Sequence, residues 1–254
     1  GYARLHARLV ERELVERDIA LAQRIQQQFL PGRCVAPSGY GVAVHFKPAL
    51  GVSGDFYDQI DLGAGRVAYV IGDVSGKGVS AALYASTLTT HMRYQAVGQS
   101  DPGAILSRTN AVLAGRGHEG MFATMIVAVL DTATGAVQMA NAGHPPPFRR
   151  RRDGTTEAVR GTTATPIGLD PSVSYPVAPL TLAPGDALVL YTDGVIEALD
   201  VKQRLFDEAR TIEAIGASNG TPDGVVRALS TAIEKFVGSA SQSDDITILT
   251  LCRN

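Results

Sequence analysis

The sequence contains little cysteine, no tryptophan and no long apolar run. Its two cysteines, Cys34 and Cys252, are far apart and form no CxxC pair, which argues against a disulfide framework or a zinc site and fits a reducing compartment. No apolar segment approaches the ~20 residues that span a bilayer, and no signal peptide is visible. The formal net charge of −2 gives no indication of binding to nucleic acid or to an anionic membrane. We therefore expect a cytoplasmic protein.

The composition is that of a folded chain with a sizeable core. Apolar residues make up 45% of the 254 residues and charged residues 19%, which is too apolar for disorder. The length allows one large domain or two small ones. We expect an N-terminal regulatory or linker helix in residues 1–32 and a single domain in residues 33–254. Because the chain starts at Gly1 rather than Met, we expect a domain excised from a longer protein.

Residues 3–30 have the pattern of a charged amphipathic helix, which "LPG" at Leu30–Gly32 ends. The apolar positions on one face are Leu14, Leu21, Ala22, Ile25 and Phe29. Two interpretations stay open: the helix packs on its own domain, or it is a signalling linker or dimerisation helix that follows an upstream sensor.

The remainder of the chain has runs of strands with pairs of helices between them. Strands are predicted at Tyr40–Phe46, Arg66–Asp73, Phe122–Asp131, Gly135–Gly143 and Asp244–Cys252, with a hairpin turn at Asp153–Gly154. Asp186–Leu199 is predicted to be a strand that leads into a turn and a helix. Further helices are predicted at residues 79–96, 102–114, 207–217 and 222–237. This order favours antiparallel sheets covered by helices, an α+β fold, over strict βαβ alternation.

The stretch "VIGDVSGKGVSAAL" at Val70–Leu83 is a glycine-rich turn between a strand and a helix. A phosphate-binding P-loop requires GxxxxGK[ST]. Here Gly72 and Gly76 are four positions apart, and Gly78 stands where Ser or Thr is required. The stretch therefore does not predict a nucleotide-binding loop.

A serine nucleophile is not predicted either, because neither Ser53 nor Ser75 has glycines at both flanking second positions. What remains in the glycine-rich stretch is Asp73, at the end of a strand.

Acidic residues recur at strand ends along the chain. Asp55 follows Gly54 in "SGDFYD", Asp193 follows an apolar strand in "VLYTDG", and Asp244 and Asp245 precede the last strand. Each of them alone fits a turn or a helix cap. Together with Asp73 they favour convergence at one edge of a sheet.

Converging carboxylates cannot share a buried site as bare anions, because burying unpaired charge is very costly. Mg²⁺ and Mn²⁺ prefer oxygen ligands and resolve this cost. Two ions ~3.5–4 Å apart lower the pKa of a shared water and position it for in-line attack on phosphorus. The pattern therefore favours a two-metal centre.

Several segments closely resemble the PPM family of metal-dependent Ser/Thr protein phosphatases, in its bacterial SpoIIE/RsbU-like branch. The matching stretches are "VSGDFYD", "IGDVSGKGVSAAL", "MFATMIVAVLD", "NAGHPPP", "TPIGL", "LAPGDALVLYTDGVIEA" and "SDDITILTL". They occur in the family's order and cover roughly residues 20–252. The resemblance implies a four-layer αββα sandwich of two antiparallel sheets flanked by helices, with a binuclear Mn²⁺ or Mg²⁺ centre at one edge.

Carried over motif by motif, the resemblance implies that Asp55, Asp73, Asp193 and Asp244 form the catalytic metal centre, with Asp73 as the bridge. The carbonyl oxygen of Val74 would be an added ligand. Asp245 is a second candidate beside Asp244, because "SDDIT" aligns with a one-residue ambiguity. No carboxylate is identified for a third metal. The implied reaction is direct attack of water on phosphoserine or phosphothreonine, without a phosphoenzyme.

Three further residues are candidates for the substrate side of the site. Lys77 is expected near the phosphate or as a solvated turn lysine. Asn141 and His144 belong to "NAGHPPP", where His144 either shapes the substrate side or is a hydrogen-bonded structural residue. One departure from the family pattern is Ser53, which replaces the first of two glycines before the first aspartate; we expect activity to survive it.

The resemblance also implies partners. The usual substrate in this branch is a phosphorylated anti-anti-sigma (STAS-type) protein, in a partner-switching stress or developmental pathway. An upstream sensor or activator commonly acts through the N-terminal helix, and a homodimer is compatible with that helix. Two alternatives stay open: a phosphatase-fold module that serves as a binding or scaffolding element, and a hydrolase of nucleotides or other small phosphoesters.

Overall fold

The computed structural model describes residues 2–114 and 120–254; Gly1 of the predicted N-terminal unit lies outside them. The helices are α1 (Tyr2–Gln27), α2 (Val79–Ala96), α3 (Pro102–Ala114), α4 (Asp207–Gly216) and α5 (Pro222–Val237). The strands are β1 (Tyr40–Lys47), β2 (Phe56–Gly63), β3 (Arg66–Val74), β4 (Ala123–Asp131), β5 (Ala136–Ala142), β6 (Phe148–Arg150), β7 (Thr156–Ala158), β8 (Val177–Thr181), β9 (Ala187–Tyr191) and β10 (Ile246–Arg253).

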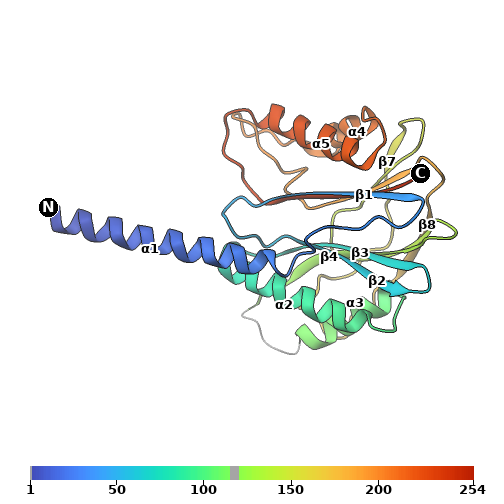
Figure 1. The fold of residues 1–254 in the computed structure, drawn as a ribbon, viewed down its shortest axis with the longest axis horizontal. Helices are drawn as coiled ribbons and strands as arrows, with labels where there is room; N and C mark the ends of the chain where they lie inside the picture. Colours follow the sequence, from blue (N-terminus) through green and yellow to red (C-terminus); the bar gives the residue numbers. More distant parts are fainter. Residues whose placement is uncertain (1, 115–119) are drawn as a thin grey trace.

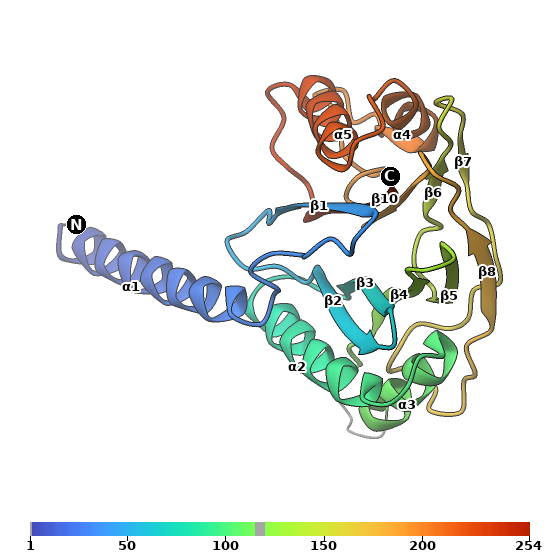
Figure 2. The same cartoon turned by 45° about the vertical axis from the view of Figure 1, so that its right-hand side comes forward.

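Two antiparallel sheets lie face to face, and a pair of helices covers the outer side of each sheet (Figures 1 and 2). The first sheet has the strand order β1-β10-β9-β6-β7 and is covered by α4 and α5. The second sheet has the order β2-β3-β4-β5-β8 and is covered by α2 and α3. The predicted α+β class and its four-layer αββα arrangement are confirmed.

The alternation of side chains along the central strands divides the core into three layers. On β3, Tyr69 and Ile71 point between the two sheets, while Ala68 and Val70 point toward α2 and α3. Successive side chains of a strand point to opposite faces, so a strand buried on both faces is apolar throughout, as β9 also is. The outer layer beneath α4 and α5 forms the third apolar cluster.

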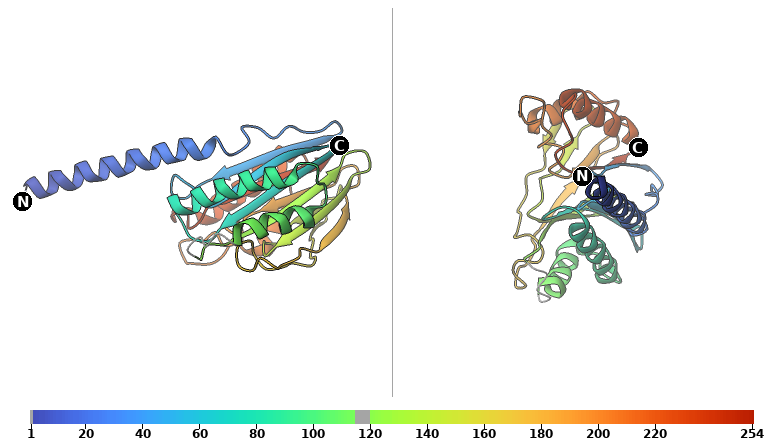
Figure 3. Two further views of the ribbon diagram at one scale, coloured as in Figure 1. Left: turned by 90° about the horizontal axis from the view of Figure 1, so that it is seen from below. Right: turned by 90° about the vertical axis from the view of Figure 1, so that its left-hand side faces the viewer.

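Helix α1 projects from the sandwich and is connected to it only at its C-terminal end (Figures 1 and 3). Leu14 is 56% exposed and Leu21 is 48% exposed, so most of the predicted apolar face is not covered by this chain. Of the two interpretations of this helix, packing on the chain's own domain therefore applies only to its last turns. Within the described ranges, no helix combines the length and the apolar character needed to cross a membrane.

Three elements differ from the sequence-based expectation. The expected helix after β9 is a turn instead, in which Glu197 N–H donates to the Asp193 carbonyl oxygen, and Val195 and Ala198 fill the core. Strand β2 was not predicted because its acidic residues break the apolar alternation. Strand β8 was not predicted because it contains Pro179, which an edge strand tolerates since one of its sides forms no ladder.

Candidate metal centre

The predicted carboxylates converge at one edge of the sandwich, although they come from both sheets. Asp55 immediately precedes β2 and Asp73 is the penultimate residue of β3, and the β2–β3 register pairs Phe56 with Gly72 beside them. In the first sheet, Asp193 follows the end of β9, and Asp244 lies just before β10. These strands end at the same edge, so the sequence prediction of convergence holds.

Asp55 is the buried member of the cluster and is bonded to the opposite sheet. Its Oδ2 accepts hydrogen bonds from the hydroxyl groups of Thr192 at 2.7 Å and Thr247 at 2.6 Å. Burial, and then the neighbouring charge of Asp73, raise the pKa of Asp55 well above its ordinary value, while the two hydroxyl donors act in the opposite direction. The carboxylate that precedes β2 is thereby fixed against the ends of β9 and β10.

Asp73 lies among other negatively charged side chains. Burial, followed by the charges of Asp193, Asp244 and Asp245, raises the pKa of Asp73 to about 7. The pKa of Asp193 is also raised, mainly by burial and then by Glu197 and Asp244. Since the charges that raise these pKa values are those of other carboxylates, the edge is short of positive charge.

Glycines at two positions allow the backbone to close around this edge. A Cβ atom on Gly54 would lie 2.9 Å from the Val74 carbonyl oxygen and 3.1 Å from Asp73 Oδ1, so these two oxygens share one neighbourhood. A Cβ atom on Gly194 would collide with the Asp245 carbonyl oxygen. Only glycine therefore lets the loop after β9 approach the segment that carries Asp244.

The donor set fits hard divalent cations. The candidate ligands are carboxylate and carbonyl oxygens, which Mg²⁺ and Mn²⁺ prefer, and their excess negative charge requires a cation. Among the described residues, no group of three or more His, Cys, Asp or Glu side chains is gathered closely enough to hold one ion alone. This arrangement fits ions that retain several water ligands, as Mg²⁺ does. A cavity of about 80 Å³, lined in part by Lys77, Asp244 and Asp245, lies at this edge.

Asp244 and Asp245 have different surroundings. Asp245 Oδ1 accepts from the Ala49 N–H at 2.7 Å, and its Oδ2 accepts from the Ser53 hydroxyl at 2.7 Å and the Gly54 N–H at 3.0 Å. Its carboxylate is thus occupied by the loop before Asp55. Asp244 Oδ2 instead faces the Lys77 ammonium group at 3.0 Å, and the Asp244 side chain is 41% exposed. This favours Asp244 over Asp245 as the candidate ligand.

Lys77 is the cation that faces this edge. Its Nζ donates to the Ser243 carbonyl oxygen at 2.9 Å as well as to Asp244, and its charge acts to lower the pKa of Asp193. The lysine of the glycine-rich turn is therefore directed at the acidic cluster and not only into solvent.

His144 lies inside the molecule and connects the two sheets. Its Nε2–H donates to the Tyr191 carbonyl oxygen at 2.9 Å, and its Nδ1 accepts from the Thr124 hydroxyl at 2.8 Å. Thr124 is the β4 partner of Asp73, and Tyr191 precedes Asp193 by two residues. Burial lowers the pKa of His144 to about 4, so the ring is neutral at pH 7.

This placement favours the structural interpretation of "NAGHPPP". Both ring nitrogens of His144 are engaged, so the ring is not available to a substrate. Asn141 serves the same local structure: its side chain accepts from the His144 N–H at 2.7 Å and donates to the His144 carbonyl oxygen at 2.9 Å. These hydrogen bonds favour a structural role for both residues.

Three residues of the site, Thr192, Thr247 and Gln26, were not predicted from the sequence, and neither was the contact of Gln26 with Ser53. Thr192 and Thr247 hold Asp55, and both stand inside the motifs "YTDG" and "DDIT", where their position next to the aspartates was a usable signal. Gln26 and Ser53 form a clamp in which Gln26 Nε2 donates to the Ser53 carbonyl oxygen at 2.5 Å and the Ser53 N–H donates to Gln26 Oε1 at 3.0 Å. Nothing in the sequence indicates that Gln26 meets Ser53.

Comparisons with known proteins agree with this fold. The family model described as "Stage II sporulation protein E (SpoIIE)" matches residues 63–254. Protein IcfG of Synechocystis sp. is 29% identical over 265 residues, covering 93% of this chain and 42% of IcfG. The phosphoserine phosphatase RsbU of Bacillus subtilis is 27% identical over 183 residues, covering 72% of this chain and 54% of RsbU. The chain thus spans about half the length of these curated relatives.

Among solved structures, the SiaA-PP2C domain of Pseudomonas aeruginosa superimposes with a TM-score of 0.82 at 22% identity. The match covers 96% of this chain and 99% of that domain. At this identity the likeness establishes the shared fold.

Asp73→Asn is predicted to remove the stabilisation that Mn²⁺ gives the folded chain. A bound ion stabilises a folded protein by about 2.7 kcal/mol when its free concentration is 100 times its Kd. For the wild type at pH 8, we therefore expect Mn²⁺ to raise the Tm. When a chelator removes the metal, the variant should be more stable than the wild type. The substitution removes a negative charge that burial and the neighbouring carboxylates destabilise. Thermal unfolding measures both effects. The control is Asp131→Asn, at the end of β4, and an equal Mn²⁺ response in Asp73→Asn would contradict the assignment.

His144→Phe is predicted to destabilise the fold by about 2–4 kcal/mol at pH 7, because it leaves the Thr124 hydroxyl and the Tyr191 carbonyl without partners. Since the pKa of His144 is lowered from 6.5 to about 4, its stabilisation is complete above pH 6.5 and is lost as the pH falls toward 4. Urea unfolding should therefore show a steeper loss below pH 6.5 for the wild type than for the variant. Parallel pH profiles would refute this, and His91→Phe on α2 is the control.

Proposed function

The chain belongs to the stage II sporulation protein E (SpoIIE) family, and from this premise we propose that it is a metal-dependent phosphoprotein phosphatase. It would hydrolyse phosphoserine or phosphothreonine in a protein. The observation that carries this proposal is the convergence of carboxylates from both sheets at one edge, with excess negative charge around Asp73. The name of RsbU, a phosphoserine phosphatase, supports the substrate class.

The proposed centre holds two ions, Mn²⁺ or Mg²⁺. Asp55, Asp73, Asp193 and Asp244 would hold them together with the Val74 carbonyl oxygen, and the hydroxyl groups of two threonines would keep Asp55 in place. When bound, the ions would neutralise charge on the phosphate and lower the pKa of a water. Asp245 would position the loop before Asp55 and is not among the proposed ligands.

The chain's own residues have defined tasks in this proposal. Asp55, held by Thr192 and Thr247 at hydrogen-bond distance, would orient an attacking water by accepting its proton or a hydrogen bond. Lys77 would place a positive charge next to the phosphate group. Because the ligands come from the ends of separate strands, the rigid sandwich keeps their spacing fixed.

We further propose the context that the family resemblance implies. The substrate would be a phosphorylated anti-anti-sigma (STAS-type) protein in a partner-switching pathway, and the site of action the cytoplasm, which suits two free cysteines. We also propose that the boundary between the N-terminal helix and the phosphatase domain lies between residues 32 and 33, and that the chain forms a homodimer through α1. The scaffold and the small-phosphoester hydrolase are the competing functions.

The N-terminal helix is proposed as the regulatory input, and a hydrogen-bonded route supports this role. Gln26 of α1 is buried and clamps the backbone of Ser53. The Ser53 hydroxyl in turn donates to Asp245 and accepts from the Asp55 N–H at 3.0 Å. A shift of α1 at an upstream sensor's signal would move Ser53, and a displacement near 1 Å can cost ~10²-fold in rate.

Asp193→Asn is predicted to lower phosphate release by at least ~10²-fold, because metal ions supply several kcal/mol of charge stabilisation. The measurement is phosphate release from a phosphoserine STAS-type protein against Mn²⁺ concentration, with Asp131→Asn as the control. Mn²⁺ binding without turnover of any phosphoprotein would favour the scaffold. Faster release from p-nitrophenyl phosphate or a nucleotide than from the phosphoprotein would favour the small-phosphoester hydrolase.

Gln26→Leu is predicted to lower the rate of phosphate release by at least ~10-fold, because the Ser53 backbone loses both of its hydrogen bonds to α1. Arg12→Ala, on the exposed part of α1, should leave the rate unchanged in the same assay. Equal rates for wild type and Gln26→Leu would show that Ser53 does not couple α1 to the centre. A truncation of residues 1–17 that alters neither activity nor oligomeric state would argue against regulation through the helix.

A further inference from the structure

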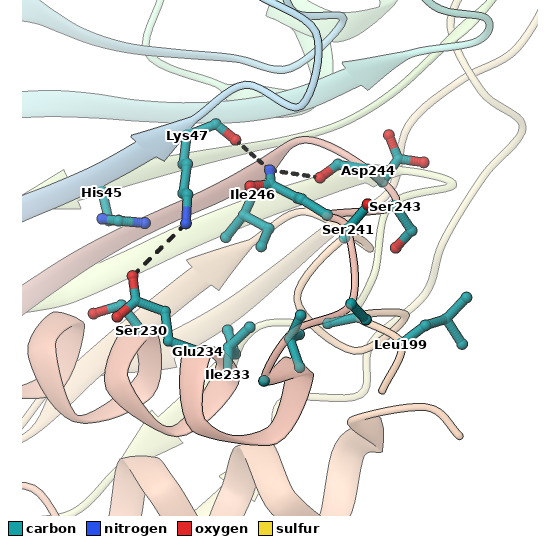
Figure 4. A pocket seen from close by; sticks show the side chains of 16 residues that line it. His45, Lys47, Leu199, Ser230, Ile233, Glu234, Ser241, Ser243, Asp244 and Ile246 are labelled. Atoms are coloured by element: carbon teal, nitrogen blue, oxygen red, sulfur yellow. Dashed lines mark hydrogen bonds and ion pairs between the residues drawn. The ribbon is translucent and has the colours of Figure 1, made fainter. Parts of the chain in front are cut away.

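A second cavity adjoins the acidic edge on the side of α5. It has a volume of about 210 Å³ and lies between α5, the ends of β1 and β10, and the loop that joins α5 to β10. Figure 4 shows its labelled lining residues, with Lys47 of β1 facing Glu234 of α5 and Asp244 on the other side of the view. Nothing in the proposed chemistry uses this cavity.

The cavity lies next to the proposed metal centre, and the two share Asp244. Asp244 and Gly194, which line it, belong to the two segments that bring carboxylates to the acidic edge. Gln242 fixes the wall between the two spaces, because its Nε2 donates to the carbonyl oxygens of Lys47 and Asp244, each at 2.8 Å. A phosphorylated residue held at the centre therefore has its chain neighbours next to this opening.

The floor of the cavity is apolar. Ala198, Ile233 and Ile246 line it and are 3%, 3% and 6% exposed. Burying a charged side chain against these residues would leave the charge unpaired, which is costly. The charges at the opening already face each other, with Lys47 Nζ 3.7 Å from Glu234 Oε1. The lining thus suits an uncharged side chain with an apolar body.

The size of the cavity also indicates an amino-acid side chain as its ligand. At about 210 Å³ it is below the roughly 300–1,000 Å³ of pockets that enclose small-molecule ligands. None of the described residues that line it is Phe, Tyr or Trp, so it offers no platform for stacking a base. One or two amino-acid side chains are the ligand that this space fits.

We propose that this cavity is a specificity subsite, which takes an uncharged, largely apolar side chain next to the phosphorylated residue of the substrate protein. The inference rests on the proposed phosphatase function, because the phosphorylated residue is what brings the segment to the opening. The subsite selects among the residues that flank the phosphorylated residue, while the acidic edge binds the phosphate group through its metal ions.

The test is the binding of labelled peptides that carry a non-hydrolysable phosphonate analogue of phosphoserine, measured by fluorescence anisotropy with Mn²⁺ present. The peptides differ in having Leu, Gly, Asp or Lys at each position adjacent to the analogue. At one of these positions, Leu peptides should bind about tenfold more tightly than Asp or Lys peptides. Ser230→Trp, which fills the cavity from α5, should abolish this preference.

Two further variants complete the test. Ser241→Trp fills the cavity from the exposed loop and should abolish the preference even if Ser230→Trp disturbs α5. Lys235→Trp, at an exposed position of α5 outside the lining, should keep it. Equal Kd values for Leu and Asp peptides, a preference that survives both cavity-filling variants, or no binding of any peptide would overturn the subsite.

Failure of the subsite and failure of the phosphatase are distinguishable. Matching phosphoserine peptides are assayed in parallel for phosphate release. Release without a flanking preference overturns the subsite and leaves the phosphatase intact. Selective binding of the phosphonate peptides without release from the phosphoserine peptides keeps the subsite and overturns the phosphatase.

Discussion

The mutual repulsion of carboxylates gathered at one edge of the sandwich is the constraint on which the rest of the site depends. Asp73 lies among Asp193, Asp244 and Asp245, and these charges together with burial raise its pKa to about 7. Such an arrangement persists in a folded protein only where the surrounding packing and hydrogen bonds over-determine it. The threonine pair on Asp55, the Lys77 ion pair and the loop held by Asp245 supply that support.

The support is distributed across both sheets, which explains why the sandwich must be rigid. Asp55 belongs to the second sheet, yet its two hydroxyl partners follow β9 and begin β10 in the first. His144 makes a second connection in the same region, from Thr124 beside Asp73 to Tyr191 near Asp193. Neither sheet holds a complete centre, so their spacing determines the distances among the carboxylates.

The sequence was sufficient for the parts of the molecule that local pattern determines. Strands such as β3 and helices such as α2 and α5 follow from apolar periodicity and turn residues, and the four aspartates follow from their repeated position at strand ends. Three features could not be predicted from the sequence. The Gln26–Ser53 clamp joins residues 27 positions apart, the orientation of His144 depends on both sheets, and β8 is masked by its proline. Each depends on tertiary contacts that no local window contains.

Helix α1 has a mechanical consequence. Its 26 residues make a rod of about 39 Å at 1.5 Å per residue, and Gln26 lies at the fixed end of this rod. A tilt that moves the free end by several ångströms moves the clamped end by a small fraction of that distance. A rotation of α1 as a rigid body about its long axis would instead turn Gln26 through the same angle as the rest of the helix. The hydrogen bonds between Gln26 and Ser53 are therefore more sensitive to rotation of α1 than to sideways movement of its free end.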